Sequence, residues 1–191
     1  MNRHWLTSYG ERIPAEINPE TYGSVLEMLE HAMKRYAEKP AFRCFGQTLT
    51  YADTDRLSRD FAAFLQAGLG IKKGDRIAVM LPNLPAFPLA MLGIIRAGAT
   101  QVNVNPLYTP RELEHQLTDA GAKAIVIFSG VSATLAKSST ARGWSRSSPS
   151  IPVTASARHC RARRSTRASR KSPPSPMHWR KARSCRWRRR G

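Results

Sequence analysis

Three aspartates that lie close together in the sequence, Asp53, Asp55 and Asp60, are the first candidates for catalytic side chains. Carboxylates at short spacing can form a general acid and base pair. Here the same spacing fits a helix cap followed by a solvated helix face, because Thr50-Tyr-Ala-Asp53 has the form of a helix start. We therefore interpret the three aspartates as structural residues and expect no catalytic pair.

Three of the five histidines, His4, His31 and His115, are isolated from one another. His31 and His115 lie on predicted helices, where we expect surface or rim positions. The sequence contains no glycine-rich phosphate loop, no G-x-S-x-G and no H-E-x-x-H. We therefore assign no catalytic residue, no cofactor-binding residue and no metal ligand from the sequence.

A last set of polar or mixed residues surrounds a strand-to-helix connection: Asn103, Asn105, Tyr108 and Arg111. α/β folds often build their sites at such connections. Turn formation and helix capping explain the same residues, and we favour that explanation for each of the four.

The elements that must position these residues begin with two helices around a hairpin. Ser24 and Glu27 form a capping box, and the helix behind them runs to about Ala37. A hairpin is expected at 41–50, around Gly46-Gln47. The second helix starts at Thr50 and ends near Gly68 and Gly70. The expected buried residues are Val25, Leu29, Ala32, Met33 and Tyr36 on the first helix, and Leu57, Phe61, Phe64 and Leu65 on the second.

The middle of the chain alternates strands and helices at the spacing of βαβ units. Short apolar runs predict buried strands at 76–81 and 122–128, and 100–104 is expected to be the strand between them in the sequence. Helices are expected at about 84–97 and from Thr109, where a cap, a proline and Glu112 follow in the usual order. One more helix begins around 132–137. The predicted fold class is α/β, with a βαβαβ order and a mostly parallel sheet.

The charge of the chain changes abruptly near Lys137. Residues 1–137 carry 15 Lys/Arg and 13 Asp/Glu, whereas residues 138–191 carry 16 Lys/Arg and no acidic residue. Almost all of the net charge of +18 therefore belongs to the last 54 positions. We divide the chain into a folded part, 1–137, and a disordered basic tail, 138–191.

Other bulk features favour a soluble, cytoplasmic protein. Cys44, Cys160 and Cys185 are scattered and lack zinc-site spacing, which fits a reducing compartment. The longest apolar run, 84–95, is too short to span a bilayer. The N-terminus lacks the apolar stretch of a signal peptide. Peripheral contact with the inner face of the membrane is compatible with this composition.

Several separate segments, in order, resemble the bacterial long-chain fatty acid–CoA ligases of the AMP-forming adenylating superfamily. The resemblance covers about residues 1–137. The matching segments are 16–19 (EINP), 49–51 (LTY), 68–83 (GLGIKKGDRIAVMLPN), 95–98 (IRAG) and 102–117 (VNVNPLYTPRELEHQL).

The resemblance implies the incomplete N-terminal part of the large domain of these enzymes. The family joins a long-chain fatty acid to coenzyme A through an acyl-adenylate, with ATP and Mg²⁺. Its phosphate loop, its Thr-Glu pair, its ribose-binding Asp and its catalytic Lys have no counterpart in this sequence. We therefore carry over no site residue, expect no cofactor to be retained, and expect this chain to be inactive.

The tail has two interpretations. As a basic arm, its arginines and its Trp179 and Trp187 could bind nucleic acid or other anions nonspecifically. As an out-of-frame continuation, its Arg, Ser, Ala and Pro residues reflect GC-rich codons. Shifting the frame by one base at Lys137 permits Val-Ile-Asp-Gly-Thr-x-Val-Val-Thr-Val-Ile, which resembles the family's own continuation. We favour the reading-frame change and retain nucleic-acid binding as the alternative.

Overall fold

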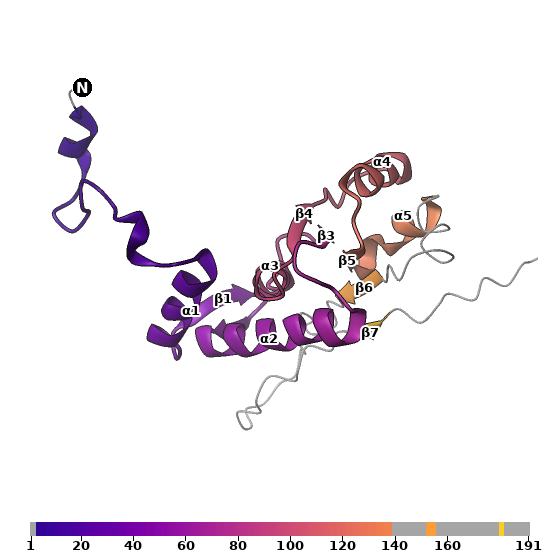
Figure 1. The fold of residues 1–191 in the computed structure, drawn as a ribbon, viewed down its shortest axis with the longest axis horizontal. Coiled ribbons are helices and arrows are strands. Elements are labelled where there is room, and N and C mark those ends of the chain that lie inside the picture. Colours follow the sequence, from indigo (N-terminus) through magenta and orange to yellow (C-terminus); the bar gives the residue numbers. More distant parts are fainter. Residues whose placement is uncertain (1–2, 139–151, 156–179, 182–191) are drawn as a thin grey trace, which may run out of the picture.

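The computed structural model describes residues 3–138, 152–155 and 180–181. A parallel sheet of β3 (Arg76–Met80), β4 (Thr100–Asn103) and β5 (Ala124–Phe128) forms its centre, in the spatial order β4-β3-β5 (Figure 1). Ile77 in the middle strand is level with Gln101 on one side and with Ala124 on the other. The predicted α/β class and parallel sheet are therefore confirmed.

Helices cover both faces of this sheet. Side chains of a strand point alternately to opposite faces, so Ile77 and Val79 face one helical layer while Ala78 and Met80 face the other. The first layer consists of α2 (Tyr51–Ala63) and α3 (Ala86–Arg96), and the second of α4 (Pro110–Ala120) and α5 (Ser132–Lys137). Each layer encloses its own apolar cluster. Fully buried members are Phe61, Leu65, Ile94, Leu113, Leu117, Ile125 and Ile127.

The helix starts follow the sequence closely. Thr50 and Thr109 each accept a hydrogen bond from the amide three residues ahead, and the carboxylates of Asp53 and Glu112 accept one from the backbone amide of the cap residue. α4 ends at Gly121, whose φ of 58° lies in the left-handed region that glycine tolerates. α3 begins at Ala86, two residues later than expected, with Pro88 in its first turn, where no helical hydrogen bond is lost.

The first helix, α1 (Val25–Arg35), differs from expectation in two ways. Glu27 accepts from Gly23 N at 2.8 Å rather than from the cap residue Ser24. Of the five residues expected on its buried face, only Met33 is buried, and Val25 is 61% exposed. α1 packs against α2 and α3 in a way that covers Met33 and leaves Val25 in solvent, so packing rather than periodicity decides burial.

The hairpin of β1 (Pro40–Cys44) and β2 (Gln47–Thr50) turns one residue earlier than expected. Its two loop residues are Phe45 and Gly46, with φ of 47° and 76°. A two-residue hairpin loop with positive φ at both positions matches the right-handed twist of its strands. The turn therefore places the bulky Phe45 in a conformation that non-glycine residues seldom adopt.

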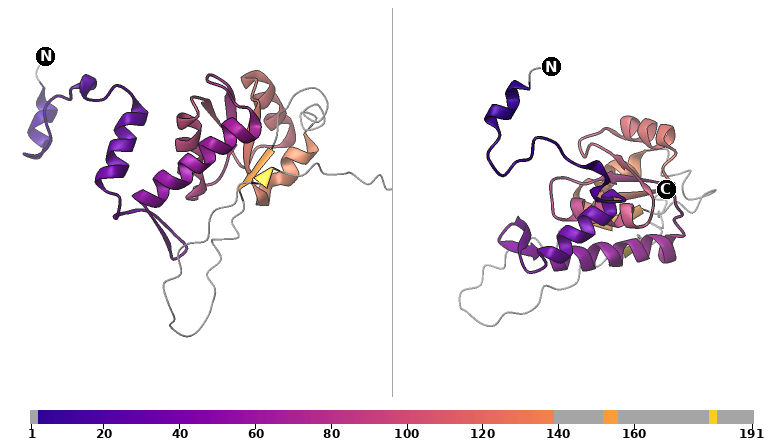
Figure 2. Two further views of the ribbon diagram at one scale, coloured as in Figure 1. Left: turned by 60° about the horizontal axis from the view of Figure 1, so that its bottom comes forward. Right: turned by 60° about the vertical axis from the view of Figure 1, so that its left-hand side comes forward.

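α2 continues beyond Ala63 as a π-helical turn, η3 (Phe64–Gly68). Before α1, the chain forms the short segments η1 (His4–Ser8) and η2 (Pro19–Thr21) and extends away from the sheet (Figure 2). Trp5, Tyr9 and Ile17 of this arm are exposed. No helix among the described residues is long and apolar enough to cross a membrane.

Beyond residue 138, the structure describes six residues, which form two short strands. β6 (Pro152–Ala155) pairs in parallel with β5, and β7 (Arg180–Lys181) pairs antiparallel with β6. Main-chain hydrogen bonds are available to almost any residue type, so a strand can add to a sheet edge without a matching sequence. The remainder of the predicted tail, residues 139–151, 156–179 and 182–191, lies outside the described residues.

Candidate functional site

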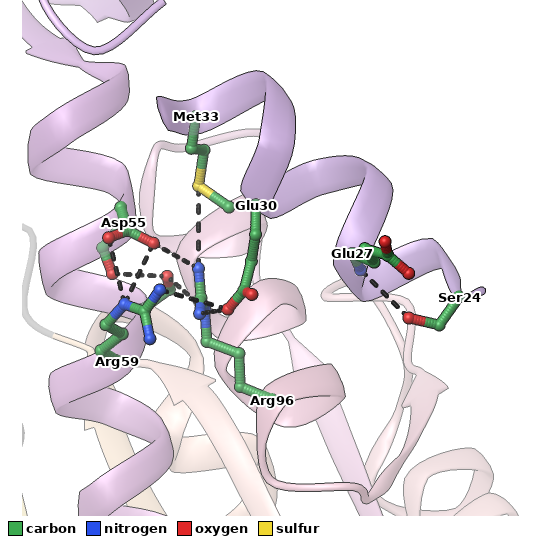
Figure 3. A network of polar contacts seen from close by, with 8 residues as sticks. Ser24, Glu27, Glu30, Met33, Asp55, Arg59 and Arg96 are labelled. Atoms are coloured by element: carbon green, nitrogen blue, oxygen red, sulfur yellow. Dashed lines mark hydrogen bonds and ion pairs between the residues drawn. The ribbon is translucent and has the colours of Figure 1, made fainter. Parts of the chain in front are cut away.

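The densest polar cluster among the described residues joins α1, α2 and α3 through Arg96, near the end of α3. The guanidinium of Arg96 contacts Glu30 of α1 through Nη1, and donates from Nη2 to Asp55 of α2 at 2.5 Å. Its Nε donates to Ser58 Oγ at 3.1 Å. Only 6% of the Arg96 side chain is exposed. Figure 3 shows the two carboxylates converging on this guanidinium from different helices.

Arg59 forms the outer half of the same cluster. Its Nε lies 3.0 Å from Asp55 Oδ2, and its Nη2 lies 3.2 Å from Glu30 Oε1. The hydrogen bond to the Asp55 carboxylate raises the pKa of Arg59 above its usual value. Arg59 and Arg96 thus share the carboxylates of Glu30 and Asp55. The Arg96 side chain is buried, whereas the Arg59 side chain lies at the surface.

The ion pairs within this cluster limit its ability to act as a general base. A general base must present a free lone pair to a substrate. Glu30 Oε1 and both carboxylate oxygens of Asp55 instead accept hydrogen bonds from two guanidinium groups that are permanently charged. We therefore interpret the cluster as a clamp that holds α1 to α2 and α3.

A solvent-open hollow of about 830 Å³ lies beside the clamp, between α1 and α2. Its wall combines the apolar Met33 and Ala52 with the charged Lys34, Asp55 and Arg59. His31 also lines it, with its ring tilted against Tyr22 at 5.8 Å between centroids. No residue from the carboxyl ends of the parallel strands lines this hollow.

The three aspartates have separate roles. Asp53 caps α2, and Asp60 lies at the exposed surface 3.7 Å from Arg56. These two match the cap and the solvated helix face expected from the sequence. Asp55 does not, because it bonds Arg96 from a position 41 residues away. No local pattern could reveal this pairing, and the same holds for Glu30, which is 66 residues from Arg96.

The histidines remain apart, as expected from their spacing. His31 and His115 are exposed on α1 and α4, and His4 packs edge-on against Trp5 in the N-terminal arm. Within the described part of the chain, no three His, Cys, Asp or Glu side chains gather in a group that could hold a metal ion.

The residues after β4 form a turn that leads into α4. Asn105 Oδ1 accepts from Leu107 N at 3.0 Å, which is the geometry of an Asx turn. Tyr108 packs against the cluster under α4, and Arg111 is exposed in the first turn of that helix. Asn103 Oδ1 accepts from Gln101 Nε2 at 2.6 Å. These contacts are those of a turn and a helix start.

Gln116 covers the outer end of β4, a feature that the sequence did not indicate. Its Nε2 donates to the backbone oxygen of Asn103 at 2.8 Å. The side-chain oxygens of Gln116 and Gln101 are buried and have no hydrogen-bond partner among the described residues. The end of β4 is thus closed by a side chain from its own following helix.

Two carboxylates outside the clamp have lowered pKa values. Lys123 Nζ at 2.5 Å from Asp75 Oδ1, followed by the backbone amide of Lys72, lowers the pKa of Asp75. The backbone amide and hydroxyl of Thr109 lower the pKa of Glu112. Asp75 closes the turn before β3, and Glu112 caps α4. Both groups therefore stabilise local structure in their charged forms.

Comparison with known proteins gives one consistent family. A model of the AMP-binding enzyme family, described as "AMP-binding enzyme", matches residues 29–183. The long-chain-fatty-acid–CoA ligase of Salmonella typhimurium is 56% identical over 137 residues, 72% of this chain and 24% of that protein. The ligase of Haemophilus influenzae is 44% identical over the same shares. This chain therefore spans about a quarter of the length of these relatives.

Solved structures with the same fold are also CoA ligases or adenylating proteins. A benzoate CoA ligase from Burkholderia xenovorans LB400 superposes with a TM-score of 0.59 at 24% identity, over 68% of this chain and 25% of that one. The N-terminal subdomain of Klebsiella oxytoca NpsA gives a TM-score of 0.52 at 25% identity, over 55% and 27% of the two chains. At such identity the first likeness is one of fold.

Proposed function

Because the chain belongs to the AMP-binding enzyme family, we propose that residues 1–137 are the opening scaffold of a long-chain fatty acid–CoA ligase. The observation that carries this proposal is the 56% identity to the Salmonella typhimurium ligase over 137 residues. The full ligase would activate a long-chain fatty acid with ATP and transfer it to coenzyme A. The scaffold's part is to form the first strands of the sheet and the helical layers around them.

The described residues do not fit a role in holding ATP or Mg²⁺. Magnesium takes oxygen ligands with free lone pairs, whereas the clustered carboxylates Glu30 and Asp55 are paired with Arg59 and Arg96. The Asn105 amide oxygen is engaged in its own turn. On this basis we propose that the chain by itself is an inactive scaffold. Its scattered cysteines, Cys44, Cys160 and Cys185, support a location in the reducing cytoplasm.

Two experiments test these two statements separately. The purified chain, incubated with palmitate, ATP, Mg²⁺ and coenzyme A, should give no acyl-adenylate or acyl-CoA by mass spectrometry, with the Salmonella ligase as positive control. Product that rises with the concentration of the purified chain would contradict inactivity.

The scaffold role is tested by a chimera in which residues 1–137 replace the aligned opening of the Salmonella ligase. We expect a folded chimera with measurable acyl-CoA formation, because substitutions that preserve core volume and pattern are tolerated in extensive combination. A soluble, folded chimera without any activity would contradict the scaffold assignment.

We further propose that a reading-frame change near codon 137 gave rise to residues 138–191. The abrupt loss of all acidic residues and the 137-residue length of the relatives' alignments support this. The match of the family model extends to residue 183, however, and this counts against a change of reading frame at residue 137. Translating the gene in all three frames is the test: an alternative frame that continues with the ligase sequence is expected, and its absence would refute the proposal.

Nucleic-acid binding by the C-terminal part is the second candidate, supported by its 16 cationic residues in 54 positions. Binding of the full chain to unrelated DNA sequences with equal affinity and a steep salt dependence would show charge alone. Preference for one sequence or structure, lost in a variant with the terminal Arg188, Arg189 and Arg190 changed to Ser, would favour a selected function.

A further inference from the structure

Most of the exposed apolar side chains of this chain lie near its N-terminus. Among the described residues, eight large hydrophobic side chains are exposed, and six of them fall within residues 5–28. These six, which we call the N-terminal surface, are Trp5, Tyr9, Ile13, Ile17, Val25 and Met28. Single exposed apolar side chains are normal on a monomer, whereas such a concentration marks an interaction site.

The segment that carries the N-terminal surface is not held by the core of this chain. None of residues 3–32 is buried, and Met33 is the first buried residue. The segment before α1 extends away from the sheet (Figure 2), while the apolar clusters of the sheet are enclosed by other helices. Ordering a segment costs conformational free energy, which buried contacts must offset. The contacts that offset this cost therefore come from another body.

The charge of the segment selects among the possible partners. Residues 1–28 contain two Arg, four Glu and no Lys or Asp, a net charge of −2, although the whole chain carries +18. Nucleic acids and anionic lipids are negative and would be repelled by this segment. In a two-fold dimer of this chain, the same patch meets itself, so two negative surfaces would face each other.

The lengths of the relatives point to a partner within the same family. This chain spans 24% of the Salmonella typhimurium ligase, so about three quarters of that protein lie outside the alignment. Segment 16–19, which lies among the six side chains, is one of those that resemble the family. The N-terminal surface thus belongs to the part of the chain that resembles the full-length enzymes, in which a much larger body follows.

We infer that the N-terminal surface docks on the remaining three quarters of the ligase, and that this contact holds the two parts together without a covalent link. The inference rests on the proposed function, because it takes the remainder of a long-chain fatty acid–CoA ligase as the partner. It goes beyond that function in naming the surface that binds and in making the binding strong enough to act between separate chains.

The test uses the chimera of residues 1–137 with the remainder of the Salmonella ligase, with a specific protease site inserted at the junction. The two parts fold as one chain and are then cut. We expect the cut parts to elute together in gel filtration and to keep forming acyl-CoA. Separation of an active chimera into two parts after cutting would overturn the inference and leave the proposed function intact. A chimera that fails to fold, or that folds without activity, would overturn both.

The matched substitutions Ile17→Ser and Leu107→Ser locate the contact. The two aliphatic side chains have the same volume and are 82% and 87% exposed, but Leu107 lies in the turn after β4, outside the N-terminal surface. Ile17→Ser should raise the dissociation constant of the cut parts about tenfold or more, since a buried isoleucine contributes at least that factor. Leu107→Ser should change it by less than about twofold. Equal effects of the two substitutions would overturn the assignment of the surface.

Two measurements on the full chain distinguish docking from folding and from self-association. Ile17→Ser should leave the urea midpoint of the full chain unchanged, because the side chain is exposed. A lowered midpoint would show that Ile17 stabilises the chain itself and would overturn the inference. The full chain should elute as a monomer, and dimers that Ile17→Ser dissociates would make a second copy the partner and overturn it as well.

Discussion

Replacing Arg96 with Met is the sharpest test of how the first three helices are held together. Methionine is close to arginine in length and keeps the apolar contact with neighbouring side chains, but it removes the charge and all donors. Arg96 donates to Glu30, Asp55 and Ser58, and its side chain is only 6% exposed. The variant therefore leaves two carboxylates facing a neutral side chain.

The expected loss can be bounded from the structure. Removing one partner of a fully buried ion pair costs about 3–5 kcal/mol. Glu30 and Asp55 remain 38% and 33% exposed, and both also contact Arg59. Water and Arg59 can therefore compensate part of the lost charge, and we expect a decrease of about 2–3 kcal/mol in the free energy of unfolding.

The assay is urea unfolding followed by far-ultraviolet circular dichroism. With a slope of about 1–3 kcal/mol per molar urea, the midpoint should fall by about 1–2 M. The matched control is Arg59→Met, which contacts the same carboxylates from a side chain that is 57% exposed and should cost about 0–1 kcal/mol. Equal effects of the two substitutions would refute the argument that burial of Arg96 makes it the centre of the clamp.

Two other predictions test the packing and the electrostatics of the same body. A Cβ on Gly93 would lie 2.6 Å from Phe61 Cδ1 and 3.1 Å from the Ser58 carbonyl oxygen. Gly93→Ala should therefore lower the free energy of unfolding by about 1–2 kcal/mol, although alanine favours helices. Gly10→Ala, whose Cβ would meet no atom within 4 Å, is the control, and equal urea midpoints of the two variants would contradict the close approach of α2 and α3. The pKa of Asp75 is lowered in the folded state by Lys123 and the Lys72 amide, so its stabilisation is present above the unfolded pKa of about 3.9 and is lost as the pH falls through the folded pKa. Asp75→Asn should therefore lower the urea midpoint at pH 7 and make little difference at about pH 2, and an undiminished difference in acid would contradict the ion pair.

Much of the fold could be predicted because its signals are local. The caps at Thr50 and Thr109 act within four residues, and their boxes form as the spacing requires. The apolar runs at β3 and β5 are buried on both faces, as expected for strands of a parallel sheet. The hairpin was found with its turn displaced by one residue, because two positive φ angles, rather than the glycine alone, define that turn.

The clamp could not be predicted, because its members are far apart in the chain. From the local sequence, Asp55 is expected to be an exposed helix residue. Arg96 is expected to be a cation in the last turn of a helix, where such residues are commonly solvent-exposed. Only the packing of α3 against α2 brings the guanidinium under α1, where it meets both carboxylates. Likewise, α1 has a regular apolar face, yet its packing against α2 and α3 buries Met33 and leaves Val25 exposed.

The sequence by itself therefore determined the type and order of the elements, the helix starts and the family, since these depend on neighbouring residues and on segments that align in order. The tertiary structure decided which charges are buried together and which helix face is covered. These outcomes depend on free energies of burial and pairing that arise only when residues distant in the chain meet.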